Sequence, residues 1–353
     1  MNKTFLISSL LLSSIAVSPF TLSDEKHEIA NLKQRLAVLE NAKASEQETE
    51  SWSKNITISG VLEFEASYED SDSASSSSDL VVATAELGID AAVTDQISAL
   101  VTLLYEEDGD GVEVDIASAS YNPDGNNFSF VLGQDYLPFG AYGTALVNDP
   151  LALDIGEARE TTFIVNYEND AVNGAFYIFN GDQDEDGKDT LVNYGARLAV
   201  SNDTFSMGLD YLSNLADSDG LQEKDFGYAA GAGVVDGVSV YGSINIGAMT
   251  VMAEHLSALD DFGVDGNGSE PSASQFEVAV GAGNFTYAIS YQQTDESVFI
   301  GLPEERLSVG FSTEIFGGIS LGAQLQQDED YSVANGGTGD TTNAAVIQLA
   351  AEF

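Results

Sequence analysis

Cysteine is absent from the 353 residues of this chain, and basic residues are scarce. Without cysteine the chain has no disulfides, no thiolate metal sites and no lipidated N-terminal cysteine. The 11 lysines and arginines stand against 58 aspartates and glutamates, which gives a formal net charge of −47. A field of this sign attracts cations and repels nucleic acid, so we expect no nucleic-acid partner. Disorder often accompanies such a charge, but 43% of the residues are hydrophobic and many are patterned, which favours a folded protein.

Long apolar runs are absent after the first 23 residues, so the remaining chain offers no transmembrane helix. Lys3 and the apolar stretch Phe5–Phe20 are typical of a secretory signal peptide, which we place at residues 1–23. A buried N-terminal helix is the alternative interpretation. If the rest of the chain lies in a membrane, it must form a closed β-barrel, because only helices and barrels satisfy the backbone in lipid.

One stretch of the chain has helical periodicity. Its leucine and isoleucine positions, spaced by three, four and three, are Ile29, Leu32, Leu36 and Leu39. This is the a/d spacing of a coiled coil, so we predict a short periplasmic helical segment and linker over residues 24–54. Two heptads leave two interpretations open: an oligomeric stalk, which would make the protein a homo-oligomer, and a loosely ordered periplasmic linker.

After this segment the hydrophobic period changes to two. In the first alternating segment one face is apolar and the other carries Glu63 and Glu65. The next two segments place Glu86, Asp90 and Glu106 on the polar face. Because carboxylates cannot point at lipid, these five side chains are predicted to line a water-filled lumen.

The connections between alternating segments are short and long in turn, and the long ones are acidic and rich in glycine and serine. This pattern predicts a transmembrane antiparallel β-barrel of about 16 strands over residues 55–353, an even number as in bacterial barrels. The weakest strands are at 112–121 and 225–236, and the second could be a loop. A soluble all-β sandwich or solenoid is the alternative.

The end of the sequence points to a cellular location. Residues 344–353 alternate between apolar and polar side chains and stop at Phe353, as expected for the closing strand of an outer-membrane barrel. A terminal aromatic residue also resembles the signal that the bacterial barrel-insertion machinery reads. We therefore expect the protein in the outer membrane of a Gram-negative bacterium, in contact with lipid and lipopolysaccharide, with its N-terminal segment in the periplasm.

The most distinctive block of sequence follows the fifth predicted strand. It reads Gly-Gln-Asp-Tyr136-Leu-Pro138-Phe139-Gly, then Asp149-Pro-Leu, then Gly-Glu157-Ala-Arg159-Glu160. This block resembles that of the LbtU-type siderophore porins, and the resemblance covers nearly the whole chain after the signal peptide. It implies an outer-membrane barrel that takes up ferric siderophores by diffusion without TonB coupling. The numbered residues of the block become candidates for the pore and its constriction.

The physical properties of this block can be read separately from the resemblance. Its prolines and glycines favour a loop, and residues 135–158 are enough to fold into the lumen and narrow it. Arg159 between Glu157 and Glu160 can set a field across the constriction that orients a polar solute. Alternatively, Arg159 pairs with Glu157 or another lumen carboxylate and holds the loop. The two aromatic residues of the block can equally be interfacial anchors or loop-packing residues.

A calcium-like sequence lies in the next long loop. Asp182, Asp184 and Asp186 occupy the first, third and fifth positions, and glycine follows, as in the first half of a calcium loop. The twelfth position is Asn193 instead of the expected bidentate glutamate, so a solvated acidic loop is the alternative. No other cofactor is expected.

Catalytic signatures are missing from the sequence. The two histidines lie in the predicted helical segment and in a strand, and no serine or threonine stands in a recognisable nucleophile motif, so we expect no enzyme. The acidic lumen predicts a channel for small cationic or polar solutes, and the resemblance implies ferric siderophores as its cargo. The alternatives are a general cation-preferring porin and a structural or tethering barrel.

Overall fold

The computed structural model describes residues 54–107, 109, 111–181, 193–223, 234–263 and 270–353. The predicted signal peptide and nearly all of the predicted helical segment lie outside these residues. The stretch Ile56–Phe353 forms one compact unit. Among the described residues, no helix combines the length and the apolar character needed to cross a membrane.

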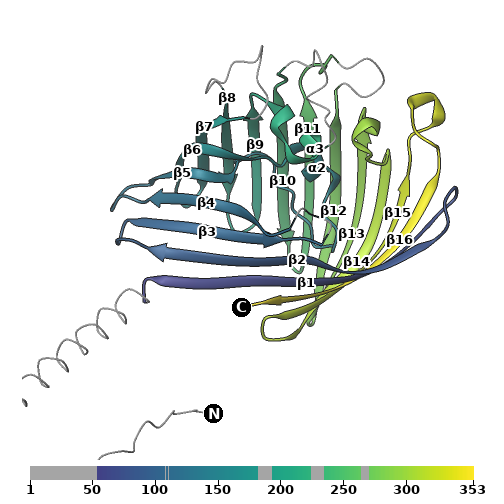
Figure 1. The fold of residues 1–353 in the computed structure, drawn as a ribbon, viewed down its shortest axis with the longest axis horizontal. Coiled ribbons are helices and arrows are strands. Elements are labelled where there is room, and N and C mark those ends of the chain that lie inside the picture. The colour runs from purple at the N-terminus through teal and green to yellow at the C-terminus, as the bar shows by residue number, and fades with distance from the viewer. Residues whose placement is uncertain (1–53, 108, 110, 182–192, 224–233, 264–269) are drawn as a thin grey trace, which may run out of the picture. The chain divides into compact units, whose positions relative to one another are not determined.

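Sixteen antiparallel strands of the described chain close into a barrel, as predicted (Figure 1). Each strand pairs with its neighbours in sequence, and β16 pairs with β1. The strands are β1 Ile56–Ser71, β2 Ser77–Ala92, β3 Ile97–Tyr105, β4 Glu113–Tyr121, β5 Phe128–Tyr136, β6 Arg159–Glu168, β7 Val172–Asn180, β8 Asn193–Ser201, β9 Phe205–Leu212, β10 Gly237–Ile246, β11 Met249–Ala258, β12 Ser272–Ala282, β13 Phe285–Asp295, β14 Glu305–Phe316, β15 Ile319–Glu329 and β16 Thr341–Glu352.

The closing strand is where the sequence predicted it. Leu62 lies opposite Ala351 in the β1–β16 ladder. The ladder continues past the end of β16, because the backbone N–H of Phe353 donates to the carbonyl of Gly60 at 3.1 Å and the reverse hydrogen bond is 3.0 Å. The ring of Phe353 packs directly over Gly60, where any added Cβ would collide with it.

The two faces of the wall differ in chemistry as the period of two predicts. Large apolar side chains stand exposed on the outer face, as at Leu132, Phe176, Leu198, Phe276, Ile289, Leu325 and Ile347. Side chains of opposite parity point inward and include many buried polar groups, such as Asp210, Glu254, Glu277, Gln292 and Gln324. The exposed apolar face suits lipid and the polar face suits an aqueous interior.

A β-bulge corrects the predicted alternation in β2. Glu63 lies opposite Thr84, but its neighbour Phe64 lies opposite Val82, so β2 holds one extra residue at this point. The extra residue reverses the faces of the strand beyond it. Val82 and Leu80 therefore share the outer face with Phe64, whereas unbroken alternation from Leu87 would place Val81 there.

The structure describes one of the two uncertain strands and shows the lengths of the connections. The uncertain strand at 112–121 exists as β4. Most of the segment 225–236 lies outside the described residues, and β10 begins after it. The alternation of connections is confirmed, since those following even-numbered strands run from two residues at 247–248 to six at 122–127. We call that end of the barrel the short-turn end and the other the long-loop end.

Two short helices of the described residues lie in the connections at the long-loop end. Helix α2, Leu151–Gly156, belongs to the β5–β6 connection, and α3, Asp219–Glu223, belongs to the β9–β10 connection. Figure 1 shows the two helices side by side, and α2 also contacts β11, β12 and β13. The described part of the chain also contains the 3-10 turns η2 Leu215–Asp217, η3 Val298–Ile300 and η4 Val333–Asn335.

The apolar core lies inside the barrel, between these connections and the wall. It combines residues of the β5–β6 connection, the strand interior and the β9–β10 connection: Leu137, Phe139, Leu151, Ala152, Ile155, Ala158, Ile164, Tyr177, Phe179, Leu212, Leu256, Leu215, Ala216 and Leu221. An interior that is partly filled with apolar side chains leaves less room for water on that side.

We predict that an added positive charge destabilises the barrel more on its outer face than on its inner face. Ile347 is 55% exposed and lies between Ala66 and Ala323 on the outer face. Ile347→Arg should lower the free energy of unfolding from liposomes by about 2–4 kcal/mol, the cost of arginine on the lipid face near the bilayer centre. The matched control is Gln348→Arg, because Gln348 points inward and donates to Glu65 at 2.9 Å. Equal losses for the two variants would contradict the assigned faces.

Candidate functional site: the loop that crosses the lumen

The β5–β6 connection, residues 137–158, folds into the barrel, and we call it the inner loop. Its two ends lie on adjacent strands, where the backbone of Leu137 donates to the carbonyl of Ala158 at 2.8 Å. Between these ends the loop reaches inward-facing side chains of β11, β12, β13 and β15. Because β15 lies six strands from β5 around the wall, the loop crosses the lumen.

Two buried glutamates hold the first part of the inner loop. The carboxylate of Glu254 accepts hydrogen bonds from the backbone N–H groups of Ala141 at 2.7 Å and Tyr142 at 2.8 Å. Glu277, which is 0% exposed, accepts from the N–H of Ala145 at 2.7 Å and from the hydroxyl of Thr144 at 2.8 Å. Hydrogen bonds to a charged acceptor are stronger than neutral ones, so these carboxylates fix the loop against the wall.

Two glutamines hold the second part. The side-chain oxygen of Gln324 accepts from the N–H of Val147 at 2.9 Å and of Asn148 at 3.0 Å. The oxygen of Gln292 accepts from the N–H of Leu151 at 2.7 Å, at the start of α2. Four wall side chains therefore accept six backbone N–H groups that have no strand partner, which removes the cost of burying them unpaired.

The start of the inner loop is held from the opposite side of the wall. Arg197 on β8 donates to the carbonyl of Gly140 and also pairs with Asp210 on β9 at 2.7 Å. The hydroxyl of Tyr177 donates to the carbonyl of Pro138 at 3.2 Å. Phe139 is 2% exposed and lies in the apolar core, so the loop-packing interpretation of this residue is the one that the structure supports.

Helix α2 can approach the wall because it ends in glycine. A Cβ added at Gly156 would collide with the side chain of Leu256 and the hydroxyl of Tyr142. Leu151 and Ile155 on the same helix are buried in the core. The short helix therefore turns the middle of the inner loop into an apolar wedge against β11 and β12.

Arg159 is paired, although not with Glu157. Its guanidinium contacts Asp115 at 2.7 Å and Glu113 at 3.1 Å, both on β4. The hydroxyl of Tyr136 also donates to Asp115, at 2.8 Å. These contacts bridge the place where the β4–β5 ladder stops, since the last paired residues are Ala117 and Gln134. The sequence could not identify the partner, because a bulge between Thr102 and Leu103 of the β3–β4 ladder brings Asp115 to this position.

A second inserted segment was missed by the sequence analysis. The β9–β10 connection enters the long-loop end, where the N–H of Asp219 donates to the carbonyl of Glu157 at 2.7 Å. Gly220 lies so close to the backbone of Asp154 that a Cβ would not fit. The available signal was the group of apolar residues, Leu215, Ala216 and Leu221, inside an acidic outer loop.

A cavity of about 770 Å³ lies beside the two inserted segments at the long-loop end. Carboxylates dominate its polar lining: Glu106, Glu113, Asp154, Glu157 and Asp219, with Arg159 and Tyr136 beside them. Burial, and then repulsion from Asp219, Asp149 and Asp115, raises the pKa of Glu157 to about 7. The cavity therefore gains negative charge as the pH rises through neutrality.

The remaining predicted residues occupy several places. Glu63 and Glu65 on β1 and Glu86 on β2 are partly buried, on the inward side of the wall. Asp90 shares their parity but is exposed near the short-turn end. Glu160 is buried on the inward side of β6 beside the candidate Arg159.

The remaining candidates stand apart from those on the wall. Asp149, on the inner loop, is exposed and close enough to Glu63 for the two carboxylates to repel. The calcium-like residues Asp182, Asp184 and Asp186 lie outside the described residues, so that site stays a prediction. Within the described part of the chain, no three acidic or histidine side chains are grouped to hold a metal ion.

Comparison with known proteins finds distant relatives. No protein-family model matches the chain. A UPF0422 protein of Coxiella burnetii is 26% identical over 324 residues, which cover 83% of this chain and 69% of that protein. A UPF0422 protein of Legionella pneumophila strain Paris is 22% identical over 351 residues, covering 84% and 66%. The chain spans about two thirds of the length of these relatives. Neither is named as a siderophore porin, so the likeness to that family remains a prediction.

Solved structures identify the fold as that of the outer-membrane porins. The outer-membrane channel DcaP of Acinetobacter baumannii has a TM-score of 0.62 at 17% identity, covering 84% of this chain and 97% of that one. OmpF of Salmonella typhi in complex with daunomycin has a TM-score of 0.58 at 11% identity, covering 84% and 97%. OmpT of Vibrio cholerae in its trimer form has a TM-score of 0.54 at 11% identity, covering 84% and 99%.

The hydrogen bonds of Glu254 lead to a prediction about the inner loop. Glu254→Ala leaves the N–H groups of Ala141 and Tyr142 without their acceptor, so the free energy of unfolding should fall by roughly 2–3 kcal/mol. Protease cleavage within the inner loop should become faster in the folded barrel. Gln348→Ala is the control, since Gln348 is a polar inward residue that contacts Glu65. A loop that stays protected in Glu254→Ala would contradict the anchoring role.

The raised pKa of Glu157 leads to a prediction about pH. The carboxyl is neutral below its pKa of about 7 and negative above it. Cation selectivity in planar bilayers should therefore increase between pH 6 and pH 8. In Glu157→Gln this increase should disappear and the selectivity should stay at its low-pH value. A transition that persists in the variant would belong to another group.

Proposed function

We propose that this protein is an outer-membrane channel that passes small cationic and polar solutes by diffusion. The main observation in support of this proposal is that the inner loop narrows the lumen on one side and leaves the acidic cavity of about 770 Å³ on the other. A narrowed, water-filled passage is what a diffusion channel requires. The similarity to porin structures supports a channel in preference to an enzyme.

Charge pairing within the wall supports cation preference. Arg159, Arg197 and Arg306 are the arginines among the described residues, and each pairs with an aspartate of the wall. The partners of Arg197 and Arg306 are on the next strand, and that of Arg159 is two strands away, on β4. Their positive charges are therefore compensated locally, and the other carboxylates around the cavity set the sign of the field. Five carboxylates and one arginine line the cavity, and such an excess of negative charge favours cations over anions.

Uptake of ferric siderophores is the narrower form of this proposal. Its support is the sequence block that contains Tyr136, Pro138, Phe139 and Arg159. In the structure this block contributes to the inner loop and to the strand ends on either side of it, because β5 ends at Tyr136 and β6 begins at Arg159. A siderophore complex would have to pass between the inner loop and the acidic wall of β1–β4. Periplasmic placement of the N-terminal segment and assembly into homo-oligomers belong to the same proposal; one similar structure is described as a trimer.

The test is conductance of the refolded full-length protein in planar bilayers with a salt gradient. We expect open channels whose reversal potential shows preference for cations. Addition of ferric siderophores one at a time should reduce the current for the transported compound, whereas the same siderophore without iron should not. Open cation-selective channels whose current no siderophore reduces would support the proposed channel and contradict siderophore uptake. Absence of conductance would contradict the channel itself and favour a tethering barrel.

A further inference from the structure

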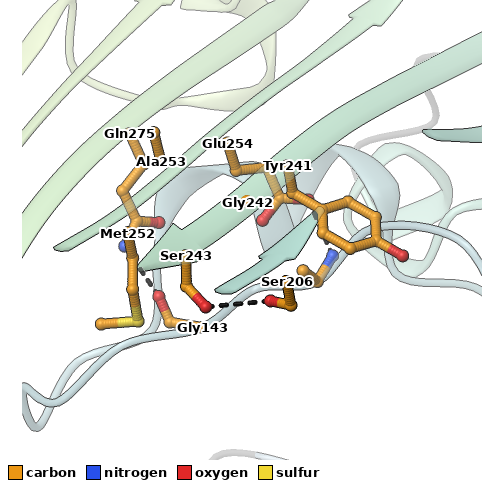
Figure 2. A pocket seen from close by; sticks show the side chains of 10 residues that line it. Gly143, Ser206, Tyr241, Gly242, Ser243, Met252, Ala253, Glu254 and Gln275 are labelled. Carbon is orange, nitrogen blue, oxygen red and sulfur yellow. Dashed lines mark hydrogen bonds between the residues drawn. The ribbon is translucent and has the colours of Figure 1, made fainter. Parts of the chain in front are cut away.

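A second cavity lies on the other side of the inner loop. It has a volume of about 220 Å³ and is bounded by the loop and by strands β9–β12 (Figure 2). Ser206 follows the short turn 202–204, and Met252 follows the short turn 247–248, so the cavity lies toward the short-turn end. We call it the short-turn recess. The loop residues at its edge, Ala141 and Gly143, are exposed, so it opens to the lumen.

One buried acceptor in this recess lacks a donor. Gln275 is 5% exposed, and its side-chain nitrogen donates to the carbonyl of Gly143 at 2.9 Å. Its side-chain oxygen has no hydrogen-bond partner. The bond to Gly143 fixes which end of the amide faces the loop, and Figure 2 shows the oxygen on the side of Ser243 and Tyr241. A buried acceptor left unpaired costs free energy, which a donor from a bound molecule would recover.

The other polar groups of the recess are already engaged. The hydroxyls of Ser206 and Ser243 bond to each other at 2.9 Å. The carboxylate of Glu254 accepts from the two loop N–H groups and from Ser239 at 2.8 Å. The remaining lining is apolar or aromatic, with the thioether of Met252, the ring of Tyr241 and the backbone of two glycines.

We propose that the short-turn recess binds a small, flat, mostly apolar molecule that carries a single N–H or O–H donor. The donor reaches the side-chain oxygen of Gln275, and the flat body lies between the ring of Tyr241 and the thioether of Met252, a combination that favours aromatic surfaces. Such a subsite goes beyond cation passage, because it selects a neutral solute by one hydrogen bond and by shape. Its occupancy does not depend on the ion selectivity of the channel.

The experiment uses the methionine methyl groups of the full-length protein in detergent micelles. Met252 lines the recess, whereas Met207 is 55% exposed on the outer face and reports partitioning of a ligand into detergent. Indole is the probe, because it is flat and carries one N–H donor. 1-Methylindole is the matched ligand, because it has the same shape without the donor. In ¹³C-methyl NMR, indole should shift Met252 with saturation, and 1-methylindole should bind at least tenfold more weakly.

Two variants test the assignment from different directions. Gln275→Leu removes the acceptor and should abolish the difference between the two ligands. Gly143→Val should fill the recess and leave Gln275 in place, since an added Cβ would lie 3.6 Å from the sulfur of Met252, an ordinary contact. This variant should lose the indole shift.

Three outcomes would overturn the subsite. Equal shifts of Met252 with both ligands would contradict the proposed hydrogen bond to Gln275. A shift of Met207 alone would indicate detergent partitioning, and no shift of Met252 would indicate a recess that holds only water, which can also donate to Gln275. Cation-selective conductance together with any of these results would leave the proposed channel standing. Saturable binding of indole by a protein that shows no conductance would support the subsite and contradict the proposed channel.

Discussion

The interior of the barrel depends on hydrogen bonds in which side chains of the wall accept backbone N–H groups of the inner loop. The inner loop has no strand partner within the lumen, and water cannot reach every peptide group where the loop packs against the wall. Glu254, Glu277, Gln292 and Gln324 supply the missing acceptors, each from a different strand. If they were apolar, the buried N–H groups would each cost free energy, and the loop would lie in solvent instead.

This arrangement divides the interior into two unlike halves. On one side the loop, the β9–β10 connection and the wall of β7–β13 bury an apolar core that contains Phe139, Ile155 and Leu221. On the other side lies the acidic cavity, whose carboxylates come from β4, from the β3–β4 connection and from the two inserted segments. The same loop thus excludes water from one half and defines the polar passage in the other, so the position of one segment determines both the stability and the bore of the barrel.

Much of the architecture follows from the period of two. The lipid-facing residues, the closing strand at Phe353 and the order of short and long connections are all local patterns, and the structure contains each of them. Deviations from strict alternation were not predictable. The extra residues in β2 and β4 reverse the faces of Val82 and bring Asp115 to Arg159, and nothing in composition or spacing marks a bulge at those points.

The candidate site was predictable in outline and not in detail. Prolines and glycines indicated that residues 135–158 form a loop, but its anchors Glu254 and Gln324 lie more than 100 positions away, and their pattern is that of any inward-facing residue. The sequence assigned Arg159 to the constriction with two possible roles, and the pairing role is the one observed. The entry of α3 was not anticipated, because a long acidic loop suggested exposure to solvent.

The ladder between β1 and β16 has a consequence for how the molecule assembles. In every other ladder of the barrel the two strands are consecutive in sequence. Bringing them together therefore costs less chain entropy than closing the barrel. The closing ladder joins residues that are far apart in sequence, such as Glu65 and Gln348, which are separated by 283 positions. Until it forms, both edge strands expose unpaired backbone groups that would pair with any other chain. Closure is therefore the step of high contact order, and the rate of folding and the risk of aggregation depend on it.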